Sequence, residues 1–509
     1  MTRWRLAILV GAIVAIRAPS LFVPILNEDE ALYAATAASM AEGAPPYRAG
    51  VESKPPGIFY LYEAGFALTG RYNMIGIHAL TMLWVLGTAL LVGAMAKRVR
   101  PEAELPAALL YVAFTIVEEP AVMASQCELL YSLPLAAAAF LLIKAITGTQ
   151  RRAGESVLRA ALIVLAGVLC GAGTLIKPTA ISLPIATTGF LVLRRWLVGG
   201  PDRFIIDLGR AALLWVGFAL AWFCAYLYFD SLGVWDDLIY WAFRWTLGTY
   251  IPTGNDHSPW VSRFLAGFCG WLALASILWV LAAIGFRRRE KGNQIVWFAV
   301  AWTLCATALT FLGGRFFDHY FPAVIPPLAL LGGVGYATLR RKRLAIGIAA
   351  VPVLACWLAV WNIHTVQNWF GEPIRHYDGI AEYVEAHSKS DERVFVWGYF
   401  PPLYVASGRL AATRYTGCHY ITGYAAIGLG RDLPPETEDK LGIPDGFKIL
   451  ISDLERYRPI LVVDTAPADL HHWRRYPMSR YPVLAAYVAK NYVRIATVQD
   501  AVIYRRKSE

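Results

Sequence analysis

The sequence has little charge and lacks the local motifs of soluble nucleotide-binding enzymes. Only 17% of its 509 residues are charged. No GxGxxG stretch stands between a strand and a helix and no DxD ends a strand, so no nucleotide-binding loop is indicated. There is no internal repeat of solenoid period and no low-complexity linker. Function must therefore be sought in scattered residues.

The cysteines also lack any useful arrangement. All seven are scattered, mostly inside apolar runs, with no CxxC pair and no metal-ligand spacing. We interpret them as small core residues, and a disulfide between Cys127 and Cys418 outside the membrane is the alternative.

Apolar residues, in contrast, make up 57% of the chain and gather into runs about twenty residues long. Such runs predict a polytopic α-helical membrane protein with about eleven transmembrane helices. The first run contains Arg17 and two prolines and lacks a cleavage site, so we expect a retained helix instead of a signal peptide. The runs are 6–26, 73–96, 104–120, 129–147, 157–176, 179–193 (short enough to be re-entrant), 211–229, 264–286, 294–312, 321–339 and 344–363.

Basic residues indicate the orientation. The net charge is +10, but Lys and Arg form short clusters in every second loop and no face suited to nucleic acid. Such clusters mark the cytoplasmic side, so we expect a cytoplasmic N-terminus and place the other loops and the tail outside. The clusters are Arg3/Arg5, Lys97/Arg98/Arg100, Arg151/Arg152, Arg194/Arg195, Arg287/Arg288/Arg289/Lys291 and Arg340/Arg341/Lys342/Arg343.

The first outer loop contains two helical stretches, DEALYAATAASMAEG and KPPGIFYLYEAGFAL. Their apolar spacing predicts amphipathic helices along the membrane surface, the second begun by its prolines. The tail has strand-like stretches, RVFVWGY, PILVVDT and VRIATVQDAVIYRR, and a helical one, IAEYVEAHS, which predict a small extracytoplasmic α/β domain. We therefore divide the chain into a membrane body, residues 1–364, and a C-terminal domain, residues 365–509.

Charged residues gather at the outer ends of the apolar runs. Asp29 and Glu30 stand where the first span meets a helix, either as a solvated helix start or as a site. Lys54 precedes two prolines that hold its backbone extended, either as a snorkelling lysine or as a cation for an anionic head group. Ionisable residues near membrane depth are functional candidates. Further candidates are Glu128, Lys177, Arg315, Asp318, His319 and Tyr320.

A divalent metal remains an open alternative. Asp318 with His319 could ligate one, joined from another loop by Asp256 and His257, but neither pair has a strong ligand spacing. Arg17, inside the first run, is expected to pair structurally within the bundle.

Four motifs in order carry a family resemblance: DEALYA, SKPPGIFYL, an acidic residue that opens the fourth span, and GRFFDHYFPAVIPPLALL. Together they resemble the polyprenyl-phosphate-sugar-dependent glycosyltransferases of the GT-C fold, that is glycosyltransferase family 39 and the protein mannosyltransferase superfamily. Lipid A aminoarabinose transferase and the lipopolysaccharide-core galacturonosyltransferases are similar. The resemblance covers most of residues 1–364.

The resemblance implies roles for these residues. An acidic residue of the first outer loop is the catalytic base in that family, which corresponds to Asp29, with Glu30 completing the pair. The lysine before the prolines contacts the donor phosphate, which corresponds to Lys54. The family usually has Asp where this chain has Glu128. It often has Glu directly before Lys-Pro-Pro, where Ser53 stands here.

The implied reaction transfers a sugar, with inversion, from a polyprenyl phosphate to an acceptor hydroxyl on a glycan, lipid or protein. Asp29 would take the acceptor proton, and Lys54 and Arg315 would stabilise the departing phosphate. The implied location is the bacterial inner membrane with a periplasmic C-terminal domain. The alternatives are a transporter or flippase of lipid-linked sugars, whose charges typically lie at the membrane midplane, and a scaffold protein with a sensing domain.

Overall fold

The computed structural model describes residues 1–117, 123–147, 153–199, 203–255, 257–361, 377–427 and 434–508. Its contacts divide the chain into two compact units. The helical unit comprises Met1–Val23, His78–Gly233 and Trp260–Trp361. The mixed unit comprises Pro24–Ile77, Val234–Pro259 and Asn362–Glu509. The predicted domain boundary after residue 364 lies outside the described residues.

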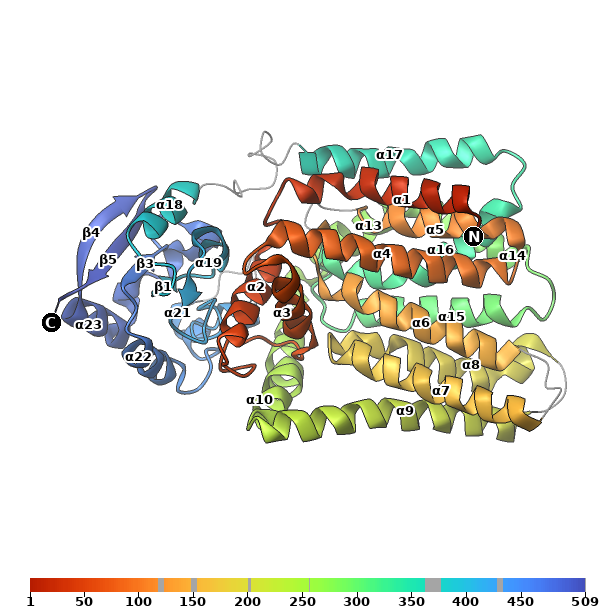
Figure 1. The fold of residues 1–509 in the computed structure, drawn as a ribbon, viewed down its shortest axis with the longest axis horizontal. Helices are drawn as coiled ribbons and strands as arrows, with labels where there is room; N and C mark the ends of the chain where they lie inside the picture. The colour runs from red at the N-terminus through yellow and green to blue at the C-terminus, as the bar shows by residue number, and fades with distance from the viewer. Residues whose placement is uncertain are drawn as a thin grey trace. The chain divides into compact units, whose positions relative to one another are not determined.

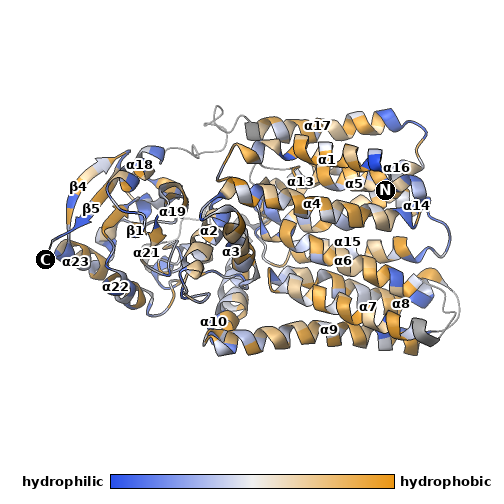
Figure 2. Cartoon of the chain, in the orientation of Figure 1, coloured by the Kyte–Doolittle hydropathy of each residue, from blue (hydrophilic) through white to orange (hydrophobic). Residues whose placement is uncertain are grey.

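The helical unit is built from long apolar helices that run side by side in Figure 1, and Figure 2 shows apolar residues along them. The main helices are α1 (Arg3–Arg17), α4 (Met74–Lys97, begun in the mixed unit), α5 (Glu104–Phe114), α6 (Cys127–Thr147), α7 (Ala153–Thr174), α8 (Ser182–Val198), α9 (Phe204–Ser231), α14 (Ser276–Arg287), α15 (Gln294–Thr310), α16 (Ile325–Ala337) and α17 (Lys342–Trp361).

The chain is a multi-pass membrane protein. In its described part, eight helices are long and apolar enough to cross a membrane, or nine if the bent pair Trp260–Leu274 and Ser276–Arg287 forms one span. The run at 179–193 lies in the 21-residue helix Pro178–Val198, which has the length of a full span. Two other runs form shorter helices, α5 and α15. The count of eleven spans stays a prediction.

Small residues and the buried Arg17 organise this unit. A Cβ added to Gly167 of α7 would lie 2.1 Å from the Leu214 oxygen of α9, so glycine permits this close helix approach. Arg17 is fully buried, and its guanidinium donates to the Met123 carbonyl oxygen at 2.5 Å. The expected pairing of Arg17 within the bundle is confirmed. All seven cysteines, Cys127 and Cys418 included, are free thiols.

The mixed unit contains the only sheet in the described part of the chain, with strand order β2-β1-β3-β5-β4. β1 runs parallel to β2 and β3, whereas β5 runs antiparallel to β3 and β4. The strands are β1 (Arg393–Trp397), β2 (Leu410–Ala411), β3 (Leu461–Asp464), β4 (Tyr492–Val498) and β5 (Ala501–Arg506). All three predicted strand regions are confirmed, and the two-residue β2 was not predicted.

Helices complete this unit around an apolar core that includes Val394, Val396, Leu461, Val463 and Ile503. The helices are α2 (Glu28–Ala41), α3 (Gly57–Thr69), α10 (Trp235–Ile239), the π-helix η5 (Tyr240–Tyr250), α11 (Ile251–Gly254), α18 (Asp378–Ala386), α19 (Pro402–Ser407), α20 (Tyr424–Ile427), α21 (Pro435–Asp439), α22 (Gly446–Tyr457) and α23 (Pro482–Asn491). The predicted helical stretch IAEYVEAHS corresponds to α18.

Helix α2 differs from the amphipathic surface helix that we predicted. Every residue from Glu30 to Met40 is buried, because α2 packs against α3 and also against α19 and β2 of the tail. Its many alanines permit this close packing on all sides. Helix α3 does have two faces, with Phe59 and Tyr62 buried and Leu68 exposed.

Candidate active site

At the start of α2, Asn27, Glu30 and Asp29 have different roles. Asn27 caps the helix, because its side-chain oxygen accepts from the Asp29 amide at 2.7 Å. Glu30 is fully buried and accepts from the Leu26 amide at 2.5 Å. Asp29 does not serve as the cap, and its carboxylate reaches side chains elsewhere in the mixed unit. Its Oδ2 lies 3.6 Å from Lys54 Nζ and 3.5 Å from Tyr33 Oη.

The loop before α3 fixes Lys54. Tyr47 in this loop has a φ of +64°, a left-handed conformation that is rare for a bulky residue. Its hydroxyl donates to the Lys54 carbonyl oxygen at 3.0 Å. Burial, with the charges of Glu52 and Asp237, raises the pKa of Tyr47, so the hydroxyl keeps its proton and remains a donor. Together with Pro55 and Pro56, this bond holds the lysine backbone in place.

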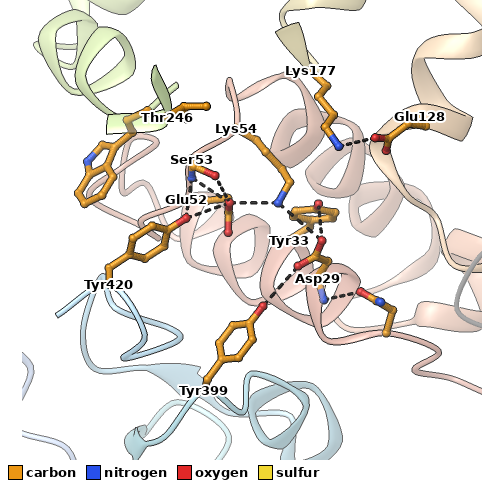
Figure 3. Close-up of polar contacts among 12 residues, drawn as sticks. Asp29, Tyr33, Glu52, Ser53, Lys54, Glu128, Lys177, Thr246, Tyr399 and Tyr420 are labelled. Atoms are coloured by element: carbon orange, nitrogen blue, oxygen red, sulfur yellow. Dashed lines mark hydrogen bonds and ion pairs between the residues drawn. The ribbon is translucent and has the colours of Figure 1, made fainter. Parts of the chain in front are cut away.

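Glu52 is the centre of the hydrogen-bond network. Only 3% of it is exposed. Its Oε1 accepts from the Ser53 amide at 2.8 Å, the Ser53 hydroxyl at 2.9 Å and the Tyr420 hydroxyl at 3.0 Å. Lys54 Nζ lies 3.1 Å from the same oxygen. Figure 3 shows Glu52 between Tyr420 and Lys54. One buried carboxylate thus orients the lysine.

The tail contributes aromatic residues to these carboxylates. Tyr399, just after β1, donates to Asp29 Oδ1 at 3.4 Å. The ring of His419 lies 4.1 Å from that of Tyr399 and 4.2 Å from that of Tyr420, centroid to centroid. Burial lowers the pKa of His419 to about 4, so its imidazole is neutral at physiological pH. The rings of Trp241 and Trp245 contact Tyr420 edge-on.

This cluster suits general base chemistry. Two carboxylates, Asp29 and Glu52, share one ammonium, that of Lys54, which leaves one negative charge in excess. The Asp29 and Lys54 side chains are 18% and 15% exposed, so both are reachable but largely shielded from water. A partly desolvated carboxylate beside a fixed cation can accept a proton while the cation binds an anion.

The helical unit holds a second charged cluster. Glu128, at the start of α6, forms an ion pair with Lys177. The Lys177 ammonium also lies 4.3 Å from the ring centroid of Tyr320. The His319 ring contacts Tyr320, and its Nδ1 lies 3.3 Å from Asp318 Oδ1. The structure therefore brings five of the predicted residues together.

Arg315 stands three residues before Asp318 in the same loop. It is buried in the helical unit, with 3% exposed. The residue after it, Phe316, has a φ of +51°, so the loop backbone is constrained there. Asp29, Glu30 and Lys54 belong to the mixed unit, whereas Arg315 and the other five predicted residues belong to the helical unit.

No group of three or more metal-ligating side chains occurs in the described ranges. Within the described residues, Asp318 and His319 contact each other but belong to no such group. Asp256 lies outside the described residues, as does the side chain of His257. The divalent metal that the sequence left open has no group of three or more ligands in this part of the chain.

Sequence reasoning missed the central position of Glu52 and the contributions of Tyr399, His419 and Tyr420. A signal for Tyr399 was available. Ligand-binding residues often follow the carboxyl ends of parallel strands, and Tyr399 stands two residues after parallel strand β1. Tyr420 had no such signal, since it lies far from any strand end in an irregular segment.

Comparison with known proteins supports the fold. The family model of dolichyl-phosphate-mannose-protein mannosyltransferases matches residues 53–229. No curated protein matches the sequence significantly. ArnT from Cupriavidus metallidurans, solved bound to undecaprenyl phosphate, gives a TM-score of 0.64 at 14% identity and covers 100% of this chain and 99% of its own. The Archaeoglobus fulgidus oligosaccharyltransferase, tethered with an acceptor peptide, gives 0.56 at 12% identity and covers 100% and 74%. Both have the GT-C fold, and the predicted GT-C fold of this chain is confirmed.

Proposed function

We propose that this protein is a membrane glycosyltransferase that moves a sugar from a polyprenyl phosphate to an acceptor hydroxyl on the extracytoplasmic side, with inversion. The observation that carries the proposal is the pair of Asp29 and Lys54, 3.6 Å apart in the first predicted outer loop. The GT-C fold and the match to a mannosyltransferase family over residues 53–229 support it.

In the proposed reaction, Asp29 is the catalytic base. It takes the proton of the acceptor hydroxyl, whose oxygen attacks the anomeric carbon, and the bond from that carbon to the phosphate oxygen breaks. Lys54 and Arg315 stabilise the negative charge that develops on the polyprenyl phosphate. Glu30 supports the base indirectly. Its carboxylate accepts a hydrogen bond from the Leu26 amide, which holds the first turn of α2 in place.

The second cluster is assigned to substrate positioning. Lys177 is held between the Glu128 carboxylate and the Tyr320 ring, and Asp318 and His319 are paired beside them. Their ordered charges suit contacts with the polar head of the donor or with the acceptor. Glu128 occupies the position where the resembling family usually has Asp, and its ion pair with Lys177 is the observation that supports a positioning role.

We propose undecaprenyl or a similar polyprenyl phosphate as the carrier. ArnT was solved with undecaprenyl phosphate and the archaeal oligosaccharyltransferase with a dolichol-phosphate, so the fold accommodates such lipids in both relatives. The acceptor is a glycan, a lipid such as lipid A or lipopolysaccharide, or a protein. The proposed location is the bacterial inner membrane, with the N-terminus cytoplasmic and the C-terminal domain, residues 365–509, periplasmic.

The test uses purified full-length protein in lipid nanodiscs with a polyprenyl-phosphate-linked sugar. The wild type should transfer sugar to a lipid or glycan acceptor. Asp29→Asn should reduce transfer at least about 100-fold, the usual range for a lost general base, while it still binds the donor. Asp391→Asn, an exposed carboxylate of the tail, is the matched control and should remain active.

Full activity of Asp29→Asn would contradict the base assignment. Movement of the lipid-linked sugar across proteoliposomes, with no transfer to any acceptor, would instead identify a flippase. Mass spectrometry of the lipids that copurify with the protein would name the donor directly.

A further inference from the structure

We infer that the C-terminal tail supplies two positioning residues to the catalytic centre, Tyr399 for Asp29 and Tyr420, acting through Glu52, for Lys54. The inference deepens the proposed function and rests on it. The tail then takes part in the reaction by positioning the base and the phosphate-binding lysine, in addition to any role in selecting the acceptor.

The first contact concerns the base itself. Asp29 receives one tyrosine hydroxyl on each oxygen, from Tyr399 to Oδ1 at 3.4 Å and from Tyr33 to Oδ2 at 3.5 Å. Both distances are long for a hydrogen bond between oxygens, as is common before substrate binds and tightens the site. Tyr33 lies one turn along α2 from Asp29, whereas Tyr399 comes from a distant segment. Tyr399 therefore links the tail to the base.

Toward an ionised carboxylate, a protonated tyrosine hydroxyl acts as the donor. Burial, together with the charges of Asp29, Glu52 and Glu28, raises the pKa of Tyr399 well above its ordinary value, so its hydroxyl stays protonated. A donor stabilises the ionised carboxylate and lowers the pH at which Asp29 becomes a base. The other ionisable groups that the mixed unit places around Asp29 are Glu28, Glu30, Tyr33, Glu52, Lys54, His419 and His471.

The second contact concerns the cation. Tyr420 Oη donates to Glu52 Oε1 at 3.0 Å and accepts from the Ser53 amide at 2.9 Å. Glu52 Oε1 in turn lies 3.1 Å from Lys54 Nζ. Tyr420 thus fixes the carboxylate that fixes the lysine. Because Lys54 would bind the donor phosphate, its position should control donor binding.

Ring packing and a backbone hydrogen bond within the tail hold these two tyrosines together. The His419 ring lies between the rings of Tyr399 and Tyr420. The Cys418 amide donates to the Gly398 carbonyl oxygen at 2.9 Å, which ties the two tyrosine-bearing segments to each other. A Cβ on Gly417 would lie 2.7 Å from His419 Nδ1 and 2.8 Å from Tyr399 Cδ2, so a larger residue there would displace one of these rings. Such close packing restricts both rings.

The two tyrosines predict different defects. Tyr399→Phe should move the acidic limb of the pH profile of kcat/KM to higher pH by about half a unit to one unit, because Asp29 loses a donor. Tyr420→Phe should leave that limb in place and weaken binding of undecaprenyl phosphate about threefold to tenfold. The reason is that Glu52, without the Tyr420 hydrogen bond, no longer holds Lys54 in one position. The KM for the donor should rise accordingly, with a smaller change in kcat.

Tyr404→Phe is the matched control. Tyr404 is a fully buried tyrosine of the tail whose hydroxyl accepts from the Val396 amide at 3.1 Å, away from the carboxylates. Its loss removes one hydrogen bond from the same sheet region. It should lower stability and change neither the pH profile nor the affinity for undecaprenyl phosphate. Thermal unfolding of all three variants shows that each is folded.

Two measurements without turnover separate this inference from the proposed function. Infrared titration of the Asp29 carboxyl, assigned by subtraction of Asp29→Asn, should give a higher pKa in Tyr399→Phe than in the wild type. The affinity of the nanodisc-embedded protein for undecaprenyl phosphate, compared between Tyr420→Phe and the wild type, tests the role of Tyr420. An unchanged Asp29 titration in Tyr399→Phe, or unchanged lipid affinity in Tyr420→Phe, would overturn that residue's role. A wild type that binds the lipid but transfers no sugar contradicts the function alone.

Discussion

Two buried clusters of charge differ in their balance. In the mixed unit, the Lys54 ammonium serves two carboxylates, Glu52 at 3.1 Å and Asp29 at 3.6 Å. In the helical unit, the Glu128 carboxylate pairs with the single Lys177 ammonium, and Asp318 pairs separately with His319. A buried charge without a countercharge is costly unless hydrogen bonds compensate it. Tyrosine hydroxyls supply such bonds to the first cluster, and its excess negative charge leaves one carboxylate available as a base.

Removal of Lys54 breaks the two-to-one cluster and should have the largest effect. Lys54→Met removes the cation that opposes both carboxylates and the proposed phosphate ligand, so transfer should fall at least about 100-fold. Binding of undecaprenyl phosphate should weaken in parallel, as measured in nanodiscs. Lys448→Met, at an exposed site of the tail, is the control for loss of a positive charge. An undiminished rate in Lys54→Met would refute the assignment.

Breaking the one-to-one pair should affect stability most. Glu128→Gln leaves the Lys177 ammonium without the carboxylate to which it is paired, at a cost of about 3–5 kcal/mol in the free energy of unfolding. The double variant Glu128→Gln with Lys177→Met removes both charges and should recover most of this loss. Glu52→Gln should cost less, because Lys54 keeps Asp29 as a partner. Denaturation in detergent measures all three.

If the double variant is no more stable than Glu128→Gln alone, the pair does not act as a unit. The contrast between the clusters would then lie in their surroundings and not in their charge balance.

The two clusters also differ in how far the sequence predicts them. Lys177, Glu128 and Tyr320 each stand at the end of an apolar run, and ionisable groups near membrane depth are costly unless they are paired. Hydropathy therefore indicated both the spans and the residues of the second cluster. The polytopic helical architecture followed from the same signal, because length and apolar composition select membrane helices, whereas the GT-C type was expected only from the four motifs.

The first cluster was predicted only in part. Asp29 and Lys54 were found because they belong to the first outer loop and to its short motifs. Tyr399 and Tyr420 contribute from more than 340 residues away, and a contact of that separation depends on packing that no local pattern encodes. The burial of α2 has the same cause, since α19 and β2 of the tail pack against the side of α2 that the sequence pattern predicted to be exposed.

The pH dependence of the free energy of unfolding tests His419, whose ring contacts both tyrosines. Burial lowers the pKa of His419 from 6.5 to about 4, against the opposite influence of Glu52 and Asp29. Between these values the unfolded chain binds a proton that the folded chain does not, so stability falls as the pH drops through this window. The full contribution is about 3 kcal/mol near pH 4.

His419→Phe keeps a ring and removes this titration, so its stability should depend less on pH than that of the wild type. Burial raises the pKa of Asp464 to about 6, which acts in the opposite direction as the pH falls. Asp464 is common to both proteins, so the difference between their unfolding curves isolates His419. Parallel curves from pH 7 to pH 4 would show that His419 is not neutral in the folded protein.

The smallest effect is expected at a half-exposed pair in the mixed unit. Arg48 lies 2.8 Å from Asp237, and 47% of the arginine side chain is exposed. Burial raises the pKa of Asp237 and the Arg48 charge opposes that shift. Because water screens such pairs, Arg48→Ala should lower the free energy of unfolding by at most about 1 kcal/mol and leave donor binding unchanged. A loss as large as that of Glu128→Gln would show that charge balance matters less than the segments a pair connects.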